Sequence, residues 1–136
     1  MDKLTPLQKI KWLILIKASE WDDIKDPTIN NADDIDKLFD ILKESGGMSE
    51  ARDEVRYSGI ETGIKCDWSR HYESKAVASQ LPNGEWVGWT YWYGGGKHGN
   101  PEEIDWLSDV YDVECTEEEK MMTVRTFIPI QTNTDE

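Results

Sequence analysis

Basic residues are few in this sequence. Its 136 residues include 15 lysines and arginines against 28 aspartates and glutamates, which gives a formal net charge of −13. Phosphate groups would repel such a chain, so the charge balance argues against direct binding to nucleic acid or to an anionic membrane. It is compatible with high solubility alone, or with docking to a basic protein surface.

Cysteines and long apolar runs are also scarce. Cys66 and Cys115 are too few for the disulfide framework of a small secreted domain. The sequence contains no run of about 20 apolar residues, the length that a helix needs to span a bilayer. Lys9, Lys11 and Lys17 interrupt the apolar N-terminal stretch, and no cleavage site of a signal peptide follows it. We therefore expect a soluble cytoplasmic protein with no membrane partner.

Low hydrophobicity combined with high net charge can indicate disorder. Hydrophobic residues make up 38% of this chain, but they include seven tryptophans, and the apolar positions are clearly periodic. The length and these features predict one folded domain over residues 1–130 and a polar tail over residues 131–136.

Helical patterns dominate the first part of the chain. Thr5 and Pro6 suit the N-cap and first position of a helix whose apolar residues cover more than one side. This helix is either part of the core or a contact for a partner or a second copy. A second helix is expected between Asn31 and Gly46, and a third, with less apolar content, from Ser49 to Tyr57.

The hydrophobic period changes to two after His71. Alternating residues over 71–81 and 85–93 flank Pro82-Asn83-Gly84, a strong hairpin signal. A helix is expected over 101–111 and a last strand over 120–129. The fold class is therefore α+β: two or three N-terminal helices and a three- to four-stranded antiparallel sheet, with one helix inserted before the last strand.

The second strand of the hairpin carries aromatic side chains on both faces. It is either a central strand covered on both sides or a strand that exposes one face for binding. Base stacking would also need a cationic groove, which the nearby residues hardly supply, so core packing or a protein interface is favoured. The candidate binding residues here are Trp89, Tyr91, Trp92, Tyr93, Lys97 and His98.

The glycine-rich loop Gly94–Gly99 superficially resembles a phosphate cradle. It lacks the GKS or GKT of a P-loop, and acidic residues follow where an anion would lie. The alternative function for this loop is a small enzyme or ligand-binding domain, with Glu73, Lys97 and His98 around a pocket.

Catalytic and metal-binding patterns are weak. The GxSxG and HExxH motifs are absent, so we expect no enzymatic activity. Cys66, His71, His98 and Cys115 form a donor set suited to zinc, but their spacing leaves open whether they meet in the fold. We expect no metal and no cofactor.

Acidic residues concentrate near the C-terminal end. Residues 101–136 contain two basic and eleven acidic residues, net −9, whereas residues 46–100 have six and seven, net −1. An acidic binding surface would be built from Glu102, Glu103, Asp105, Asp109, Asp112, Glu114, Glu117, Glu118 and Glu119.

One part of the chain has a distinctive order of residues. The string RHYESKAVASQLPNGEWVGWTYWYGGGKHGNPEEIDW, followed by YDVEC and TVRTF, resembles small acidic proteins, of no assigned activity, encoded by tailed bacteriophages and prophages of enteric bacteria. The resemblance covers residues 60–128. It implies an accessory gene expressed inside a bacterium, and small acidic phage proteins of this kind often bind and block host proteins, including defence nucleases and polymerases.

Together these features predict a non-enzymatic protein that binds and modulates or inhibits a host protein with a basic surface, such as a nucleic-acid-handling or defence factor. The alternatives are the small enzyme or ligand-binding domain described above, and a structural or assembly protein that dimerises through the first helix. The sequence leaves the oligomeric state open.

Overall fold

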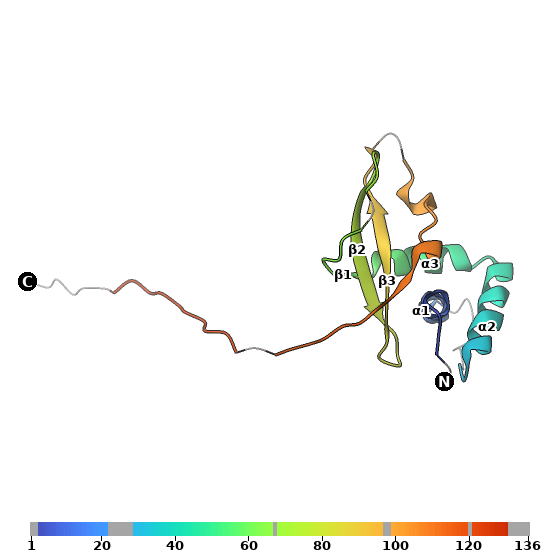
Figure 1. Ribbon diagram of the computed structural model, residues 1–136, viewed down its shortest axis with the longest axis horizontal. Coiled ribbons are helices and arrows are strands. Elements are labelled where there is room, and N and C mark those ends of the chain that lie inside the picture. Colours follow the sequence, from blue (N-terminus) through green and yellow to red (C-terminus); the bar gives the residue numbers. More distant parts are fainter. Residues whose placement is uncertain (1–2, 22–28, 67, 97–98, 120, 131–136) are drawn as a thin grey trace, which may run out of the picture.

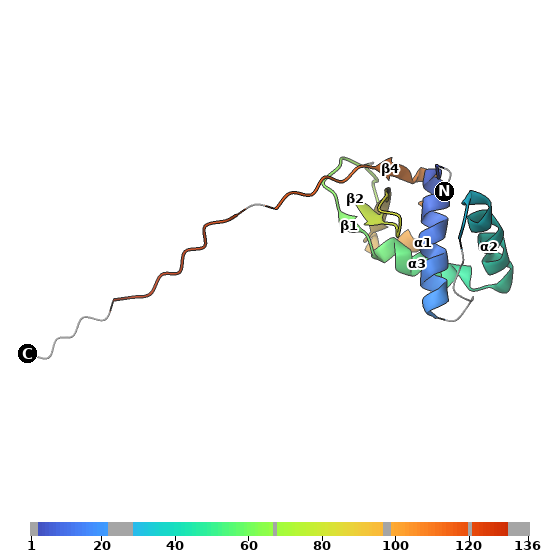
Figure 2. The same ribbon diagram turned by 90° about the horizontal axis from the view of Figure 1, so that it is seen from below.

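The computed structural model describes residues 3–21, 29–66, 68–96, 99–119 and 121–130. A four-stranded antiparallel sheet has the helices on one side: the first helix contacts the sheet, and the second packs against the first and third helices (Figures 1 and 2). The predicted α+β class is confirmed. The elements are α1 (Pro6–Glu20), α2 (Ala32–Ser45), α3 (Met48–Tyr57), β1 (Ile60–Glu61), β2 (Glu73–Gln80), β3 (Trp86–Tyr93), the 3-10 turns η2 (Pro101–Glu103) and η3 (Leu107–Asp109), and β4 (Tyr111–Val113).

Helix α1 lies in the interior of the domain. Its start is a capping box, in which the Thr5 hydroxyl accepts a hydrogen bond from the Gln8 backbone and the Gln8 side chain accepts one from the Thr5 backbone. Ile10, Ile14 and Leu15 are wholly buried, because α1 packs against α2, α3 and the sheet. Most apolar residues of this helix are therefore buried within its own chain, whereas Leu7 is 43% exposed.

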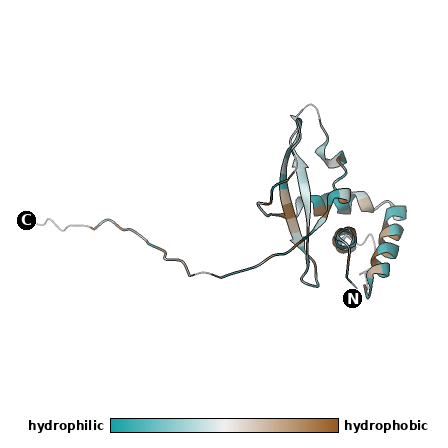
Figure 3. Ribbon diagram, in the orientation of Figure 1, coloured by the Kyte–Doolittle hydropathy of each residue, from teal (hydrophilic) through white to brown (hydrophobic). Residues whose placement is uncertain are grey.

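The second and third helices form as the sequence predicts. Asn31 caps α2 by accepting a hydrogen bond from the Asp34 backbone, and Gly46 ends it with a φ of 84°. Figure 3 shows hydrophobic and hydrophilic residues alternating along α2, as expected for a helix that buries one face. Helix α3 follows almost directly and packs against α1.

The sheet is a meander with the order β1-β2-β3-β4. The hairpin register pairs Val77 with Trp89 and Ala78 with Gly88, so neighbouring pairs point to opposite faces. The inner face, which carries Val77, Val87 and Trp89, joins the helical core. We call the opposite side, which none of the described helices covers, the outer face. The prediction that residues 85–93 form a central strand is confirmed.

The predicted helix over residues 101–111 is reduced to the two 3-10 turns. Ile104 between them is extended, with a ψ of 132°. The Ser108 backbone N–H donates to the Asp105 side chain, a local hydrogen bond that competes with the backbone bonds of a helix. This broken path lets Trp106 reach the core, where it is 2% exposed and lies 5.5 Å from Trp89 between ring centroids. A short helix has too little intrinsic stability to resist such packing.

The predicted last strand over residues 120–129 is wrong for the part of it that the structure describes. β4 is the last strand, and residues 121–130 carry no strand pairing and are all exposed. Figure 1 shows this segment running away from the domain. Alternating apolar residues can form a strand only beside a partner, and the neighbouring edge strand, β4, is three residues long.

Candidate functional site: the Lys9 cluster and the two adjoining grooves

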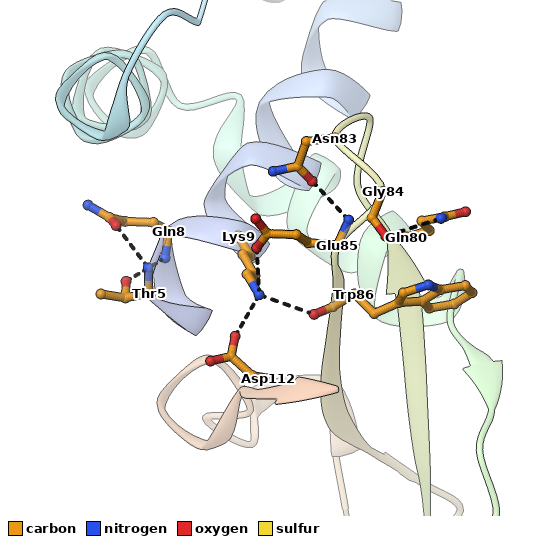
Figure 4. Close-up of polar contacts among 9 residues, drawn as sticks. All are labelled: Thr5, Gln8, Lys9, Gln80, Asn83, Gly84, Glu85, Trp86 and Asp112. Carbon is orange, nitrogen blue, oxygen red and sulfur yellow. Dashed lines mark hydrogen bonds and ion pairs between the residues drawn. The ribbon is translucent and has the colours of Figure 1, made fainter. Parts of the chain in front are cut away.

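The ammonium of Lys9 has three polar partners from separate parts of the chain. Its Nζ atom lies 2.9 Å from Glu85 Oε2 and 2.7 Å from Asp112 Oδ1, and it donates to the Trp86 carbonyl at 3.5 Å (Figure 4). The lysine is on α1, Glu85 and Trp86 belong to the hairpin, and Asp112 is on β4. One side chain, itself only 7% exposed, therefore connects three elements.

The hairpin turn holds Glu85 in place. Gly84 has a φ of 91° and donates from its backbone to Leu81 at 2.9 Å, a conformation that glycine adopts without strain. The Asn83 side chain accepts a hydrogen bond from the Glu85 backbone at 3.0 Å, as Figure 4 shows. The Asn-Gly signal in the sequence therefore does more than reverse the chain, because it also presents a carboxylate to α1.

The pKa of Lys9 reflects two opposed effects. Burial alone would lower the pKa, because it penalises the charged form. Hydrogen bonds and charge attraction from Asp112 and Glu85 together outweigh that burial, and the pKa of Lys9 is raised above its ordinary value. The lysine is therefore charged at neutral pH, and the cluster stabilises the folded state.

We expect Lys9→Met to lower the free energy of unfolding by about 1–2 kcal/mol at pH 7. The loss stays below the roughly 3–5 kcal/mol of a fully buried broken pair, because the side chains of Glu85 and Asp112 are 44% and 49% exposed and water can solvate them. Urea unfolding followed by tryptophan fluorescence measures it. Lys17→Met, on the same helix but in a more exposed pair with Glu20, is the control and should change stability by about 0.5 kcal/mol or less.

The same variant has a pH signature. The folded-state pKa of Lys9 is raised, so its contribution is complete below the unfolded-state pKa of about 10.4 and is lost as pH rises through the folded-state value. The difference between wild type and Lys9→Met should therefore be constant from pH 7 to about pH 10 and shrink above it. A difference that grows at alkaline pH would contradict the assignment.

Two grooves adjoin this cluster. The first, of about 440 Å³, we call the acidic groove; it is lined by Lys9, Glu85, Trp86, Val113, Glu114 and Glu117 among others. Because the one lysine is already paired with Glu85 and Asp112, Glu114 and Glu117 give the groove an excess of negative charge. The sequence placed these two glutamates in its acidic set but did not point to Glu85.

The second groove, of about 390 Å³, we call the apolar groove. Its walls include Ile60, Ile64, Ala78, Trp86 and Val113, with Glu61 and Glu114 also at its lining. Register places Ile60 beside Ala78, and Trp86 beside Val113, so the groove lies on the outer face of the sheet. The segment that leaves β4 contributes Glu114, Cys115 and Thr116 to its wall.

The remaining predicted acidic residues lie on two different parts of the chain. Glu103, Asp105 and Asp109 are exposed on or beside the 3-10 turns, whereas Glu118 and Glu119 are exposed on the extended segment beyond β4. Asp112 faces Lys9 and belongs to the cluster. The Glu102 side chain lies outside what the structure describes. The structure thus brings Glu114, Glu117 and Asp112 to one region with Glu85.

The aromatic candidates separate by face. Trp89 is 0% exposed and donates from Nε1 to the Arg56 carbonyl at 3.3 Å, so it belongs to the core rather than to a binding surface. Tyr91 and Tyr93 stack with ring centroids 5.5 Å apart, and Trp92 lies half-buried on the other face. Lys97 and His98 lie outside the described residues. Glu73, their proposed companion, is exposed at the start of β2.

Arg56 is a buried charged side chain that sequence reasoning missed. It is 2% exposed, donates to the Trp92 carbonyl, and its guanidinium lies 4.8 Å from the Tyr91 ring centroid and 5.0 Å from that of Tyr57. Nothing in the third helix's pattern marks a buried arginine. For Lys9 the sequence contains a weak signal of burial, since this lysine interrupts the apolar positions of a helix that is buried on several sides.

The possible zinc donors do not form a site within the described part of the chain. Cys66 Sγ lies 3.4 Å from Ser74 Oγ, and Cys115 is exposed on the segment beyond β4. No group of three or more His, Cys, Asp or Glu among the described residues could hold a metal ion. His98 lies outside those residues.

No helix among the described residues is both long enough and apolar enough to cross a bilayer. Comparison with protein-family models, with curated proteins and with solved structures finds no match to this chain.

Proposed function

We propose that this chain is a small acidic accessory protein of phage or prophage type that binds a bacterial host protein and inhibits or modulates it. The acidic groove and the exposed run Glu117–Glu119 form the binding element, and the partner presents a basic cleft, as in a nucleic-acid-handling or defence protein. The fold around the groove only positions it, and no chemical step is involved.

One observation carries the proposal. The acidic residues continue from the acidic groove, through Glu114 and Glu117, onto a segment whose described residues are all exposed. Negative charge held on an extended, accessible backbone can enter a cleft that a compact domain could not. Attraction between such a segment and a basic cleft speeds encounter and selects partners by charge.

Reversing three of these charges tests the proposal. In capture from bacterial lysate, we expect the wild-type chain to retain a basic protein at low salt and release it at high salt, because salt screens the attraction. Glu117→Lys/Glu118→Lys/Glu119→Lys should reduce the retained amount about tenfold or more.

A control with the same charge change isolates position from net charge. Asp33→Lys/Asp40→Lys/Glu44→Lys reverses three exposed carboxylates on α2, away from the acidic groove, and should leave capture nearly unchanged. Equal loss in both variants would mean that net charge alone governs retention, and unchanged retention in the first variant would refute the proposed binding element.

A further inference from the structure

The segment Met121–Ile130, which we call the apolar segment, exposes its hydrophobic side chains to solvent. Six of its ten residues are large hydrophobics, and their exposed fractions range from 79% for Ile128 to 104% for Met121. A contiguous set of exposed apolar side chains on a protein of this charge marks an interaction site rather than a solvated tail.

Its sequence is suited to one backbone conformation. Met122, Val124, Thr126 and Ile128 alternate with Thr123, Arg125 and Phe127, and β-branched and aromatic residues favour strands. Pro129 cannot donate a backbone hydrogen bond, so the strand-forming part ends at Ile128. An extended peptide of this kind binds by lying along a sheet and placing alternate side chains in pockets.

The apolar groove is a matching receptor on the same protein. It lies on the outer face, it is lined by Ile60, Ile64 and Trp86, and Ile60 and Ile64 remain 63% and 47% exposed. The strand at this edge of the sheet, β1, is only two residues long, and its outer side is unpaired in the described structure.

The apolar segment and the apolar groove are also complementary in charge. The apolar segment has a single charged residue, Arg125, whereas the rest of the chain has a net charge of −14. Glu61 and Glu114 line the apolar groove. The apolar segment is therefore the only part of this chain beyond β4 that an acidic neighbour would attract rather than repel.

We propose that the apolar segment binds in the apolar groove of a second copy of this chain, and that two copies exchange these segments reciprocally. The segment's own groove is already walled by Glu114, Cys115 and Thr116, which lead the chain outward, and Figure 2 shows the chain continuing away from the sheet. The three glutamates Glu117–Glu119 oppose the tight turn that a return would need. Residues 114–120, fully extended, span up to about 25 Å, which is enough to reach a neighbour.

The exchange has twofold symmetry, so it closes on a dimer instead of extending into a fibre. Its salt response is the opposite of that expected for a basic partner. Two copies of the chain, each of net charge −13, repel each other, and salt screens that repulsion, so dimerisation should strengthen with salt while capture of a basic protein weakens. The two proposals can therefore fail independently.

Sedimentation equilibrium of the full chain over a range of concentrations is the test. We expect wild type to reach twice its 15.7 kDa mass and to dimerise more tightly at high salt. Val124→Asp/Ile128→Asp, on the docking face of the apolar segment, should weaken dimerisation a hundredfold or more, because two apolar side chains lose their burial. Thr123→Asp/Phe127→Asp, which introduces the same two charges on the other face, is the matched control and should weaken it far less.

A groove variant completes the design. Ile60→Asp changes an exposed residue, so it should fold normally and fail to dimerise. Mixing it with Val124→Asp/Ile128→Asp should restore a mixed dimer, since one copy still has an intact segment and the other an intact groove. Equal melting temperatures of all variants show that folding is intact.

Three outcomes would overturn the proposal. The first is a wild-type chain that stays monomeric at every concentration and salt, including one whose apolar segment is protected against hydrogen exchange by its own domain. The second is a dimer that survives Val124→Asp/Ile128→Asp. The third is a dimer lost in that variant but kept in Ile60→Asp, which would mean that the segments pair with each other outside the groove.

Discussion

Replacement of Trp89 by alanine should lower the free energy of unfolding by about 3–5 kcal/mol, the largest effect expected of any single substitution in this chain. Trp89 is wholly buried in the middle of β3, between the helical core and the rest of the sheet. The substitution removes the ring contact with Trp106, whose centroid is 5.5 Å away, and the hydrogen bond to the Arg56 carbonyl. The cavity is too central to close by local relaxation.

Urea unfolding followed by far-ultraviolet circular dichroism measures this change without depending on the lost tryptophan. With a slope of about 1–3 kcal/mol per molar urea, the midpoint should fall by roughly 2 M. Trp68→Ala is the control, because Trp68 is 84% exposed and its loss should change stability by about 0.5 kcal/mol or less. Similar losses for the two tryptophans would contradict the placement of β3 at the centre of the fold.

Replacement of Arg56 by alanine should cost roughly 3 kcal/mol. The guanidinium links α3 to β3 through its hydrogen bond to the Trp92 carbonyl and lies against the rings of Tyr57 and Tyr91. A hydrogen bond from a buried charged group is worth about 1.5–3 kcal/mol, and each cation–π contact adds about 0.5–1 kcal/mol. These gains exceed the relief from no longer burying the charge, because the guanidinium has both a carbonyl acceptor and two aromatic rings beside it.

Two further variants separate charge from shape. Arg56→Lys keeps the charge but not the planar group that stacks on tyrosine, so it should recover less than half of the loss. Arg70→Ala removes an exposed arginine and should be nearly neutral. If Arg56→Lys is as stable as wild type, the planar geometry of the guanidinium does not matter and the stacking account is wrong.

Local sequence signals predicted local structure well. The capping of α1 at Thr5, the end of α2 at Gly46 and the Asn83-Gly84 turn all depend on interactions within a few residues, so their signals are contained in short stretches of sequence. The register of the hairpin follows from that turn. Two strands and three helices could therefore be placed to within a few residues.

Predictions that depended on a distant partner were less successful. The helix expected over residues 101–111 gave way to two 3-10 turns because Trp106 packs against Trp89, a contact that no local pattern encodes. The alternation over 120–129 predicted a strand, but the described residues of that range form none, and β4 offers them only three residues of edge. An alternating pattern states how a strand can pair but not what it pairs with.

By itself the sequence determined the fold class, the elements of the hairpin and the uneven distribution of acid along the chain. Only the tertiary structure decided that Lys9 pairs with Glu85 and Asp112 and that Arg56 packs against Tyr91 of β3. It also decided that the two grooves meet where the chain leaves β4. The physical reason is the distance along the chain over which each interaction acts. Caps, turns and periodicity act over a few residues, whereas a buried charge or a groove exists only where separate parts of the chain pack together.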